Sequence, residues 1–151
     1  MPFTGSRQEM RQVFFSAWRN YLDKKPLDGI NGIIVQVALQ HPEYHTLLQH
    51  PDRFEDKDYL PEHGETNPFL HLGMHVTIEE QLNIDRPRGI RSRFATLAEN
   101  RGDAHEAQHI MMECLAEMLW KAQRQGGAPD EEAYFSCLDA NLGTDTEQTG
   151  Q

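Results

Sequence analysis

Histidines are the residues in this chain whose number and spacing first suggest chemistry. The sequence of 151 residues contains eight of them, and six form pairs whose members lie four positions apart. The three pairs are His41 and His45, His71 and His75, and His105 and His109. Random placement of the same histidines would give about 0.4 such pairs on simple counting. The spacing is therefore an excess that needs a structural or chemical reason.

Two of the pairs continue into a glutamate four positions further along the chain. The repeated triplets are His71-x3-His75-x3-Glu79 and His105-x3-His109-x3-Glu113. Residues four apart stack on one side of a helix, so each triplet projects two imidazoles and one carboxylate together. On a helical wheel, both histidine pairs fall among apolar residues. We therefore expect four imidazoles to point into a helical core, where each ring nitrogen needs a partner.

Imidazoles and carboxylates that converge from facing helices are the ligands of metal centres in helical bundles. A set without thiolates favours Fe, Mn or Zn. The triplets are offset by 34 positions with one helix between them, so their helices should run parallel and face each other. We predict a mono- or dinuclear site with His45 as a further ligand; its main ligands are His71, His75, Glu79, His105, His109 and Glu113. An open coordination position would then support hydrolysis or redox chemistry, and the sequence leaves open whether the protein is an enzyme.

The alternative to a metal site is a buried hydrogen-bond network in a non-catalytic interaction or regulatory protein. A pH switch is a third interpretation, because buried neutral histidines must become charged as the pH falls. His41 carries less weight as a ligand, since it precedes Pro42 and is biased away from helical backbone. His50 and His63 lie in an acidic segment and are expected at the surface.

The elements that position these residues are predicted to be helices. Proline and glycine divide the chain into pieces in which apolar residues recur every three or four positions. This period predicts an all-α bundle of about five to six helices with a four-helix core. The expected helices cover residues 6–23, 27–40 with a short continuation at 43–49, 67–83, 85–100, 104–125 and 129–142. Residues 1–142 should form one domain, with a long surface loop at 50–66 and a disordered tail at 143–151.

The overall charge argues against a nucleic-acid partner. The chain has 14 Lys and Arg against 24 Asp and Glu, a net charge of −10, whereas phosphate binding needs a cationic surplus. One basic cluster stands out at a predicted helix start, formed by Arg86, Arg88, Arg91 and Arg93. These arginines could form an anion site. We favour the alternative, a solvated turn in which they pair with nearby acidic residues. The sequence identifies no particular protein partner and leaves homo-oligomerisation open.

Membrane and secretory signals are absent from the sequence. No stretch approaches the 18 or more apolar residues that span a bilayer, and the N-terminus lacks the apolar core of a signal peptide. We therefore expect a cytoplasmic protein without a membrane partner. Cys114 and Cys137 are too few for a disulfide scaffold or a four-thiolate zinc site, and a reducing compartment would keep both as thiols.

Four blocks of sequence together resemble an uncharacterised bacterial family, a domain of unknown function found in proteobacteria. The blocks are HPEYH at 41–45, NPFLH at 67–71 with the histidine and glutamates that follow, DRPRGI at 85–90 and HEAQHIMMECL at 105–115. The resemblance spans roughly residues 7–138 and implies a small, soluble, stand-alone bacterial protein, but it brings no activity. More loosely, the histidine spacing is similar to that of hemerythrin-like and DinB-like metal-binding bundles, which implies a metal site between helices.

Overall fold

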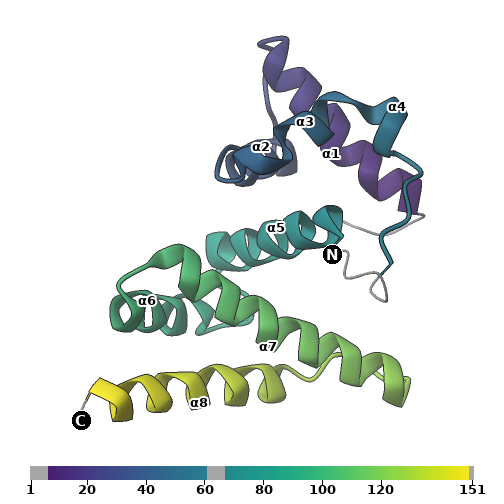
Figure 1. The fold of residues 1–151 in the computed structure, drawn as a ribbon. Helices are drawn as coiled ribbons and strands as arrows, with labels where there is room; N and C mark the ends of the chain where they lie inside the picture. Colours follow the sequence, from purple (N-terminus) through teal and green to yellow (C-terminus); the bar gives the residue numbers. More distant parts are fainter. Residues whose placement is uncertain (1–6, 61–66, 150–151) are drawn as a thin grey trace. The chain divides into compact units, whose positions relative to one another are not determined.

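The computed structural model describes the backbone of residues 7–60 and 67–149, and side chains as far as residue 142. Within these ranges the regular structure is entirely helical, so the all-α prediction is confirmed. The elements are α1 Arg7–Leu22, α2 Ile30–Leu39, the 3₁₀ turn η1 Pro42–Tyr44, α3 His45–Gln49, α4 Pro51–Phe54, α5 Pro68–Ile84, α6 Ile90–Arg101, α7 Ala104–Gln125 and α8 Glu131–Thr149 (Figure 1). None of the helices in the described part of the chain has the length and apolar character needed to cross a membrane.

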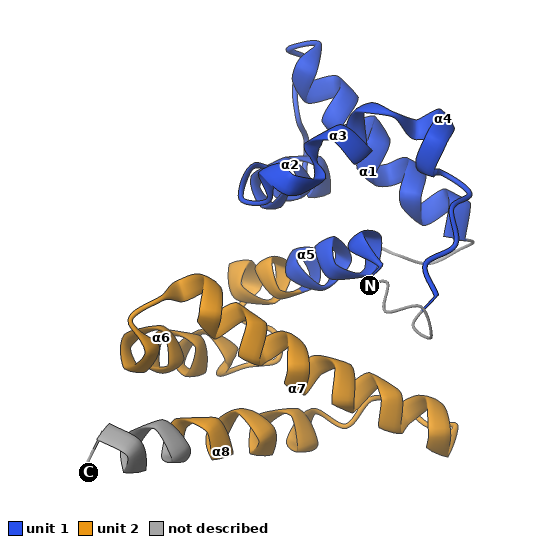
Figure 2. Ribbon diagram, in the orientation of Figure 1, with its two compact units in different colours: residues 1–77 blue, residues 78–151 orange. Residues whose placement is uncertain are grey.

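The chain divides into two compact units, where the sequence predicted one domain over residues 1–142. Unit 1 comprises residues 1–77 and unit 2 comprises residues 78–151 (Figure 2). The boundary falls inside α5, so this helix contributes its first turns to unit 1 and its last turns to unit 2. Helical periodicity predicts where a helix lies, but it does not show which neighbours each half of the helix packs against.

The core of unit 1 forms where α1, α2, α3 and the start of α5 bury their apolar faces. The buried side chains are Phe14, Phe15, Ala17, Trp18, Ile34, Val35, Val37, Ala38, Leu47, Leu48, Phe69, Leu72 and Val76. The ring of Phe69 packs edge-on against Phe15, with 5.5 Å between ring centroids. Because Phe69, Leu72 and Val76 are spaced by three and four, one face of α5 joins this core.

A buried arginine fixes the chain that follows α4. Arg11 on α1 is 1% exposed, and its guanidinium donates to the carbonyls of Phe54 at 3.1 Å, Glu55 at 3.1 Å and Lys57 at 2.8 Å. The predicted loop over residues 50–66 is therefore wrong at its start, where Pro51 opens the short helix α4. The part of that loop at 61–66 lies outside the described residues.

In unit 2, the helices α6, α7 and α8 pack against one another. The buried apolar side chains of this unit include Ile90, Leu97, Met111, Leu115, Tyr134 and Leu138. The Tyr134 hydroxyl donates to the side-chain oxygen of Gln81 at 2.8 Å, which ties α8 to the end of α5. At the start of α7 the Asp103 carboxylate accepts from the backbone N–H of His105 at 2.9 Å, as the sequence boundary at residue 104 implied.

The last helix is longer than the sequence indicated. Disorder was predicted from Gly143 onward, but the helical backbone of α8 continues to Thr149. A single glycine costs a helix about 1 kcal/mol relative to alanine, and no proline follows it in this segment. Gly143 therefore does not end this helix, which is held in unit 2 by the buried side chains of Tyr134 and Leu138.

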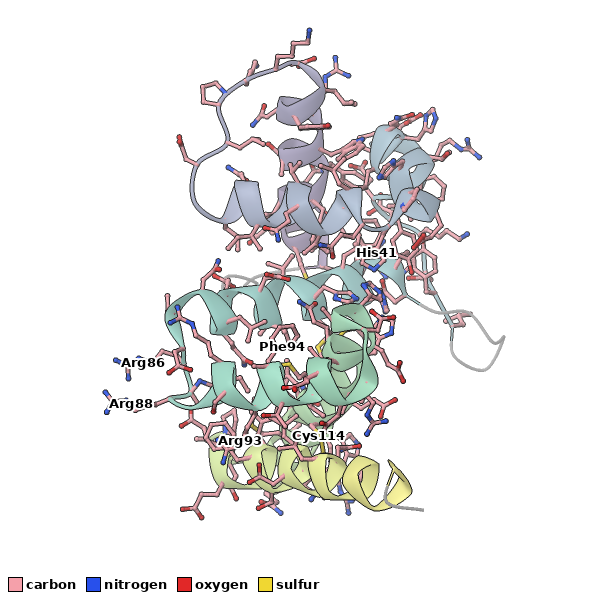
Figure 3. The ribbon with its side chains drawn as sticks, turned by 90° about the vertical axis from the view of Figure 1, so that its left-hand side faces the viewer. His41, Arg86, Arg88, Arg93, Phe94 and Cys114 are labelled. Atoms are coloured by element: carbon pink, nitrogen blue, oxygen red, sulfur yellow. A yellow bond between two sulfur atoms is a disulfide. The ribbon has the colours of Figure 1, made fainter. Side chains whose placement is uncertain are left out.

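The two cysteines form a disulfide, so the prediction of free thiols is wrong. Cys114 on α7 and Cys137 on α8 are bonded, with their Cα atoms 5.7 Å apart (Cys114 is labelled in Figure 3). The glycine-containing turn after Gln125 returns α8 along α7 and brings together residues 23 positions apart. Spacing along the sequence alone did not show this pairing because it depends on the helical hairpin.

Reducing the disulfide is expected to lower the free energy of unfolding by about 3 kcal/mol. The cross-link closes a loop with a sequence separation of 23 residues, and the chain-entropy relation gives that magnitude. Urea unfolding with and without dithiothreitol measures the effect. A Cys114→Ala, Cys137→Ala double variant is the control, since it should no longer respond to the reductant. Equal midpoints for the oxidised and reduced protein would contradict the prediction.

Candidate functional site

Three histidines meet within unit 1. His71 and His75 lie one turn apart on α5, and His41 lies at the end of α2, where the chain enters η1. The ring centroids are 4.8 Å apart for His71 and His75, 4.7 Å for His41 and His75, and 5.4 Å for His41 and His71. One potential ligand atom from each ring lies within 4.8 Å of the others. We call these three residues the histidine cluster (His41 is labelled in Figure 3).

His41 is the member of the cluster that the sequence analysis undervalued. Its backbone is non-helical, with φ −129° and ψ 69°, as expected before a proline. Its ring nitrogen Nδ1 lies 2.8 Å from the carbonyl of Val37, and because a carbonyl only accepts, Nδ1 carries the proton. The ring is therefore oriented with Nε2 as its lone-pair atom. Metal-bound histidines commonly donate their second N–H to a backbone carbonyl in this way.

His45, which the sequence analysis treated as a further ligand, has a different position. Its Nε2 donates to the carbonyl of Ala38 at 2.7 Å, and its ring lies 4.5 Å from the Trp18 ring centroid. These contacts place it beside α1 rather than in the histidine cluster. Of the pair His41 and His45, it is His41 that lies with His71 and His75 in the histidine cluster.

The histidine cluster is more closed on one side than on the other. His75 is 0% exposed and His41 is 3% exposed, whereas His71 is only half-buried. The ring of Tyr44 stacks on His41 with centroids 5.7 Å apart and meets His71 at 6.2 Å, close to edge-on. Burial, followed by the charge of Glu43, raises the pKa of Tyr44, so its phenol keeps its proton at neutral pH.

The second histidine pair belongs to unit 2. His105 and His109 lie one turn apart on α7, with their ring centroids 4.4 Å apart at 74°. Glu79 is in this unit as well, and its carboxylate accepts from the side chain of Gln108 at 2.5 Å. Glu113 is exposed on α7. The unit boundary separates Glu79 from the two histidines that precede it on α5, so the first predicted triplet does not lie within one unit.

The predicted anion position at the start of α6 is filled by a carboxylate of the protein. Asp85 accepts from the backbone N–H of Arg91 at 3.0 Å and of Gly89 at 3.2 Å. The hydrogen bond from Arg91 is the largest cause that lowers the pKa of Asp85. The side chain of Arg91 turns back to the carbonyls of Leu82 and Asn83 at the end of α5. These contacts agree with the turn that the sequence analysis favoured.

The other three arginines of the basic cluster divide into two kinds. Arg93 forms an ion pair with Asp139 at 2.9 Å and lies 4.0 Å from the ring centroid of Phe135, so it binds α8 to α6. Arg86 and Arg88 are exposed and point away from the ribbon (Figure 3). The cluster that looked continuous in sequence therefore leaves two side chains directed to solvent.

Comparison with known proteins identifies the family of this chain but no activity. A family model described as "Domain of unknown function (DUF1841)" matches residues 6–140. This range contains the whole histidine cluster and both cysteines. No curated protein and no solved structure matches the chain. The chemistry must therefore be inferred from the residues themselves.

Proposed function

Because the chain belongs to the DUF1841 family of unknown function, we propose from its own residues that it binds a transition-metal ion through His41, His71 and His75. The observation that carries the proposal is the convergence of three imidazoles from two separate segments, the residue before η1 and the helix α5. His41 and His75 are buried, and the hydrogen bond from His41 Nδ1 to the Val37 carbonyl leaves Nε2 of His41 for coordination. Neutral imidazole is a common ligand of transition-metal ions, and two of the three rings are shielded from water.

The ligand set narrows the choice of metal. Imidazole suits Zn and Fe, whereas Mn prefers oxygen ligands, and the histidine cluster holds no carboxylate among the described residues. A zinc–nitrogen bond of about 2.0–2.1 Å in tetrahedral geometry places ligand nitrogens about 3.3 Å apart. The potential ligand atoms of the three rings all lie within 4.8 Å of one another, which is compatible with a shared ion. We propose Zn or Fe as the occupant, with a metal-dependent hydrolase or oxidoreductase as the activity class.

Metal analysis of the protein purified without chelator tests the proposal. After reconstitution with Zn²⁺, or with Fe²⁺ under anaerobic conditions, we expect about one tightly held equivalent per chain. His41→Gln, His71→Gln and His75→Gln should each lose most of it, because each removes one ligand. His50→Gln is the matched control, since His50 is a half-buried histidine of unit 1 outside the cluster.

Two results would overturn the metal proposal. One is wild-type protein that stays substoichiometric after reconstitution with either ion. The other is a His75→Gln variant that keeps the metal as tightly as the His50→Gln control. The first result would favour the alternative function, a non-catalytic interaction or regulatory protein in which the same histidines serve a hydrogen-bond network.

A further inference from the structure

The histidine cluster has one side whose residues are partly exposed. His41 and His75 are buried, whereas His71 and Tyr44 are both only half-buried. Tyr44 contacts the rings of His41 and His71. An exchangeable ligand would therefore enter beside His71 and meet the ring of Tyr44.

The charge of the ligand set indicates what such a molecule would be. Three neutral imidazoles leave both positive charges of a divalent ion uncompensated by the protein groups of the cluster. A site with three protein ligands also keeps a further coordination position for water or another ligand. A half-buried cation with an open position favours a ligand that brings negative charge.

Resting on the proposed function, we infer that the metal ion held by the cluster takes one small exchangeable anion, and that the ring of Tyr44 limits its size. The ring lies nearly parallel to His41, with an angle of 16° between the planes and 5.7 Å between the ring centroids, so it covers part of that ligand. It also meets His71 at 66°. From these two contacts we expect a two- or three-atom anion to bind beside the Tyr44 ring, and a flat aromatic carboxylate to be excluded by it.

Cobalt provides the probe, because bound Co²⁺ reports its coordination through visible absorption. The full-length protein is loaded with Co²⁺ and titrated separately with azide and with benzoate. For the wild type we expect azide to change the spectrum and benzoate to leave it unchanged. For Tyr44→Ala, which removes the ring, we expect both anions to act, with benzoate bound at least about 10-fold more tightly than by the wild type.

Tyr44→Phe is the matched control, because it removes only the hydroxyl and should behave as the wild type does. Circular dichroism and cobalt stoichiometry establish that each variant keeps its fold and its metal. Tyr44→Leu, which retains apolar volume without a ring, replaces Tyr44→Ala if the latter loses helicity. The expected order of benzoate affinity is then the same.

The possible outcomes distinguish a failure of this inference from a failure of the metal proposal on which it rests. Wild-type protein that binds no cobalt would overturn both. Cobalt bound at one equivalent without a response to azide would leave the metal site standing and overturn the anion position. Equal benzoate affinity in the wild type and in Tyr44→Ala would overturn the role of the tyrosine ring.

Discussion

Replacing Arg11 by methionine is expected to lower the free energy of unfolding by about 4 kcal/mol. The Arg11 guanidinium donates to three carbonyls, that of Phe54 at the end of α4 and those of Glu55 and Lys57 in the segment after it. All three acceptors share the two N–H groups of Nη1, so the loss corresponds to about two hydrogen bonds from a charged donor, each worth about 1.5–3 kcal/mol, and water recovers part of that where the carbonyls regain access. Methionine occupies a similar volume but donates nothing, so those acceptors lose their partner.

The surroundings of Arg11 explain why the effect should be large. The side chain is 1% exposed, and its guanidinium lies 4.6 Å from the ring centroid of Phe69 and 5.6 Å from that of Tyr59. The interactions with the two rings add to the three hydrogen bonds. Arg11 therefore links α1, the segment after α4 and the first turn of α5, and the last of these carries His71 and His75.

Urea unfolding of Arg11→Met against the wild type measures this prediction. Arg19→Met is the matched control, because Arg19 lies on the same helix with its side chain 77% exposed and pairs with Asp23 one turn away. An exposed pair of this kind contributes about 0.2–1 kcal/mol, so the control should stay close to the wild type. Similar losses in the two variants would show that Arg11 has no special role.

The features of the fold that follow from local sequence were predictable. Helix periodicity located α1, α5 and α7, and the predicted start of the last of these at residue 104 agrees with the structure. The role of Arg11 was not predictable, because its acceptors lie more than 40 positions away along the chain. The disulfide between Cys114 and Cys137 was missed for the same physical reason, since it depends on the return of α8 along α7.

The candidate site shows the same division between local and tertiary information. A spacing of four placed His71 and His75 together on α5, because that contact depends only on helical geometry. The third member, His41, joins them through the packing of the α2 end against α5, and no periodicity encodes that contact. The non-helical backbone before Pro42, which argued against His41 as part of a helical ligand pair, is the conformation found where it meets the cluster.

Under the proposed function, removing the metal ion with a chelator is expected to lower the free energy of unfolding by about 4 kcal/mol. This value applies to protein kept at a free metal concentration of about 1,000 times the dissociation constant. An ion that binds only the native state stabilises it by mass action, and the cluster joins the end of α2 to α5. Urea unfolding of the reconstituted protein, with and without EDTA, measures the difference. The effect should shrink as the pH is lowered, because protons compete with the ion for the imidazole nitrogens.

Two variants, His75→Gln and His50→Gln, show whether the effect of the chelator depends on the histidine cluster. In His75→Gln the chelator should change the unfolding midpoint very little, because the ligand that contacts both other rings of the cluster has been removed. His50→Gln should keep the full response of the wild type, since His50 lies outside the cluster. If instead the wild type ignores EDTA and His75→Gln is destabilised equally with and without it, the histidines act through hydrogen bonding alone. His75 would then stabilise unit 1 through its contacts in the fold and not through a bound ion.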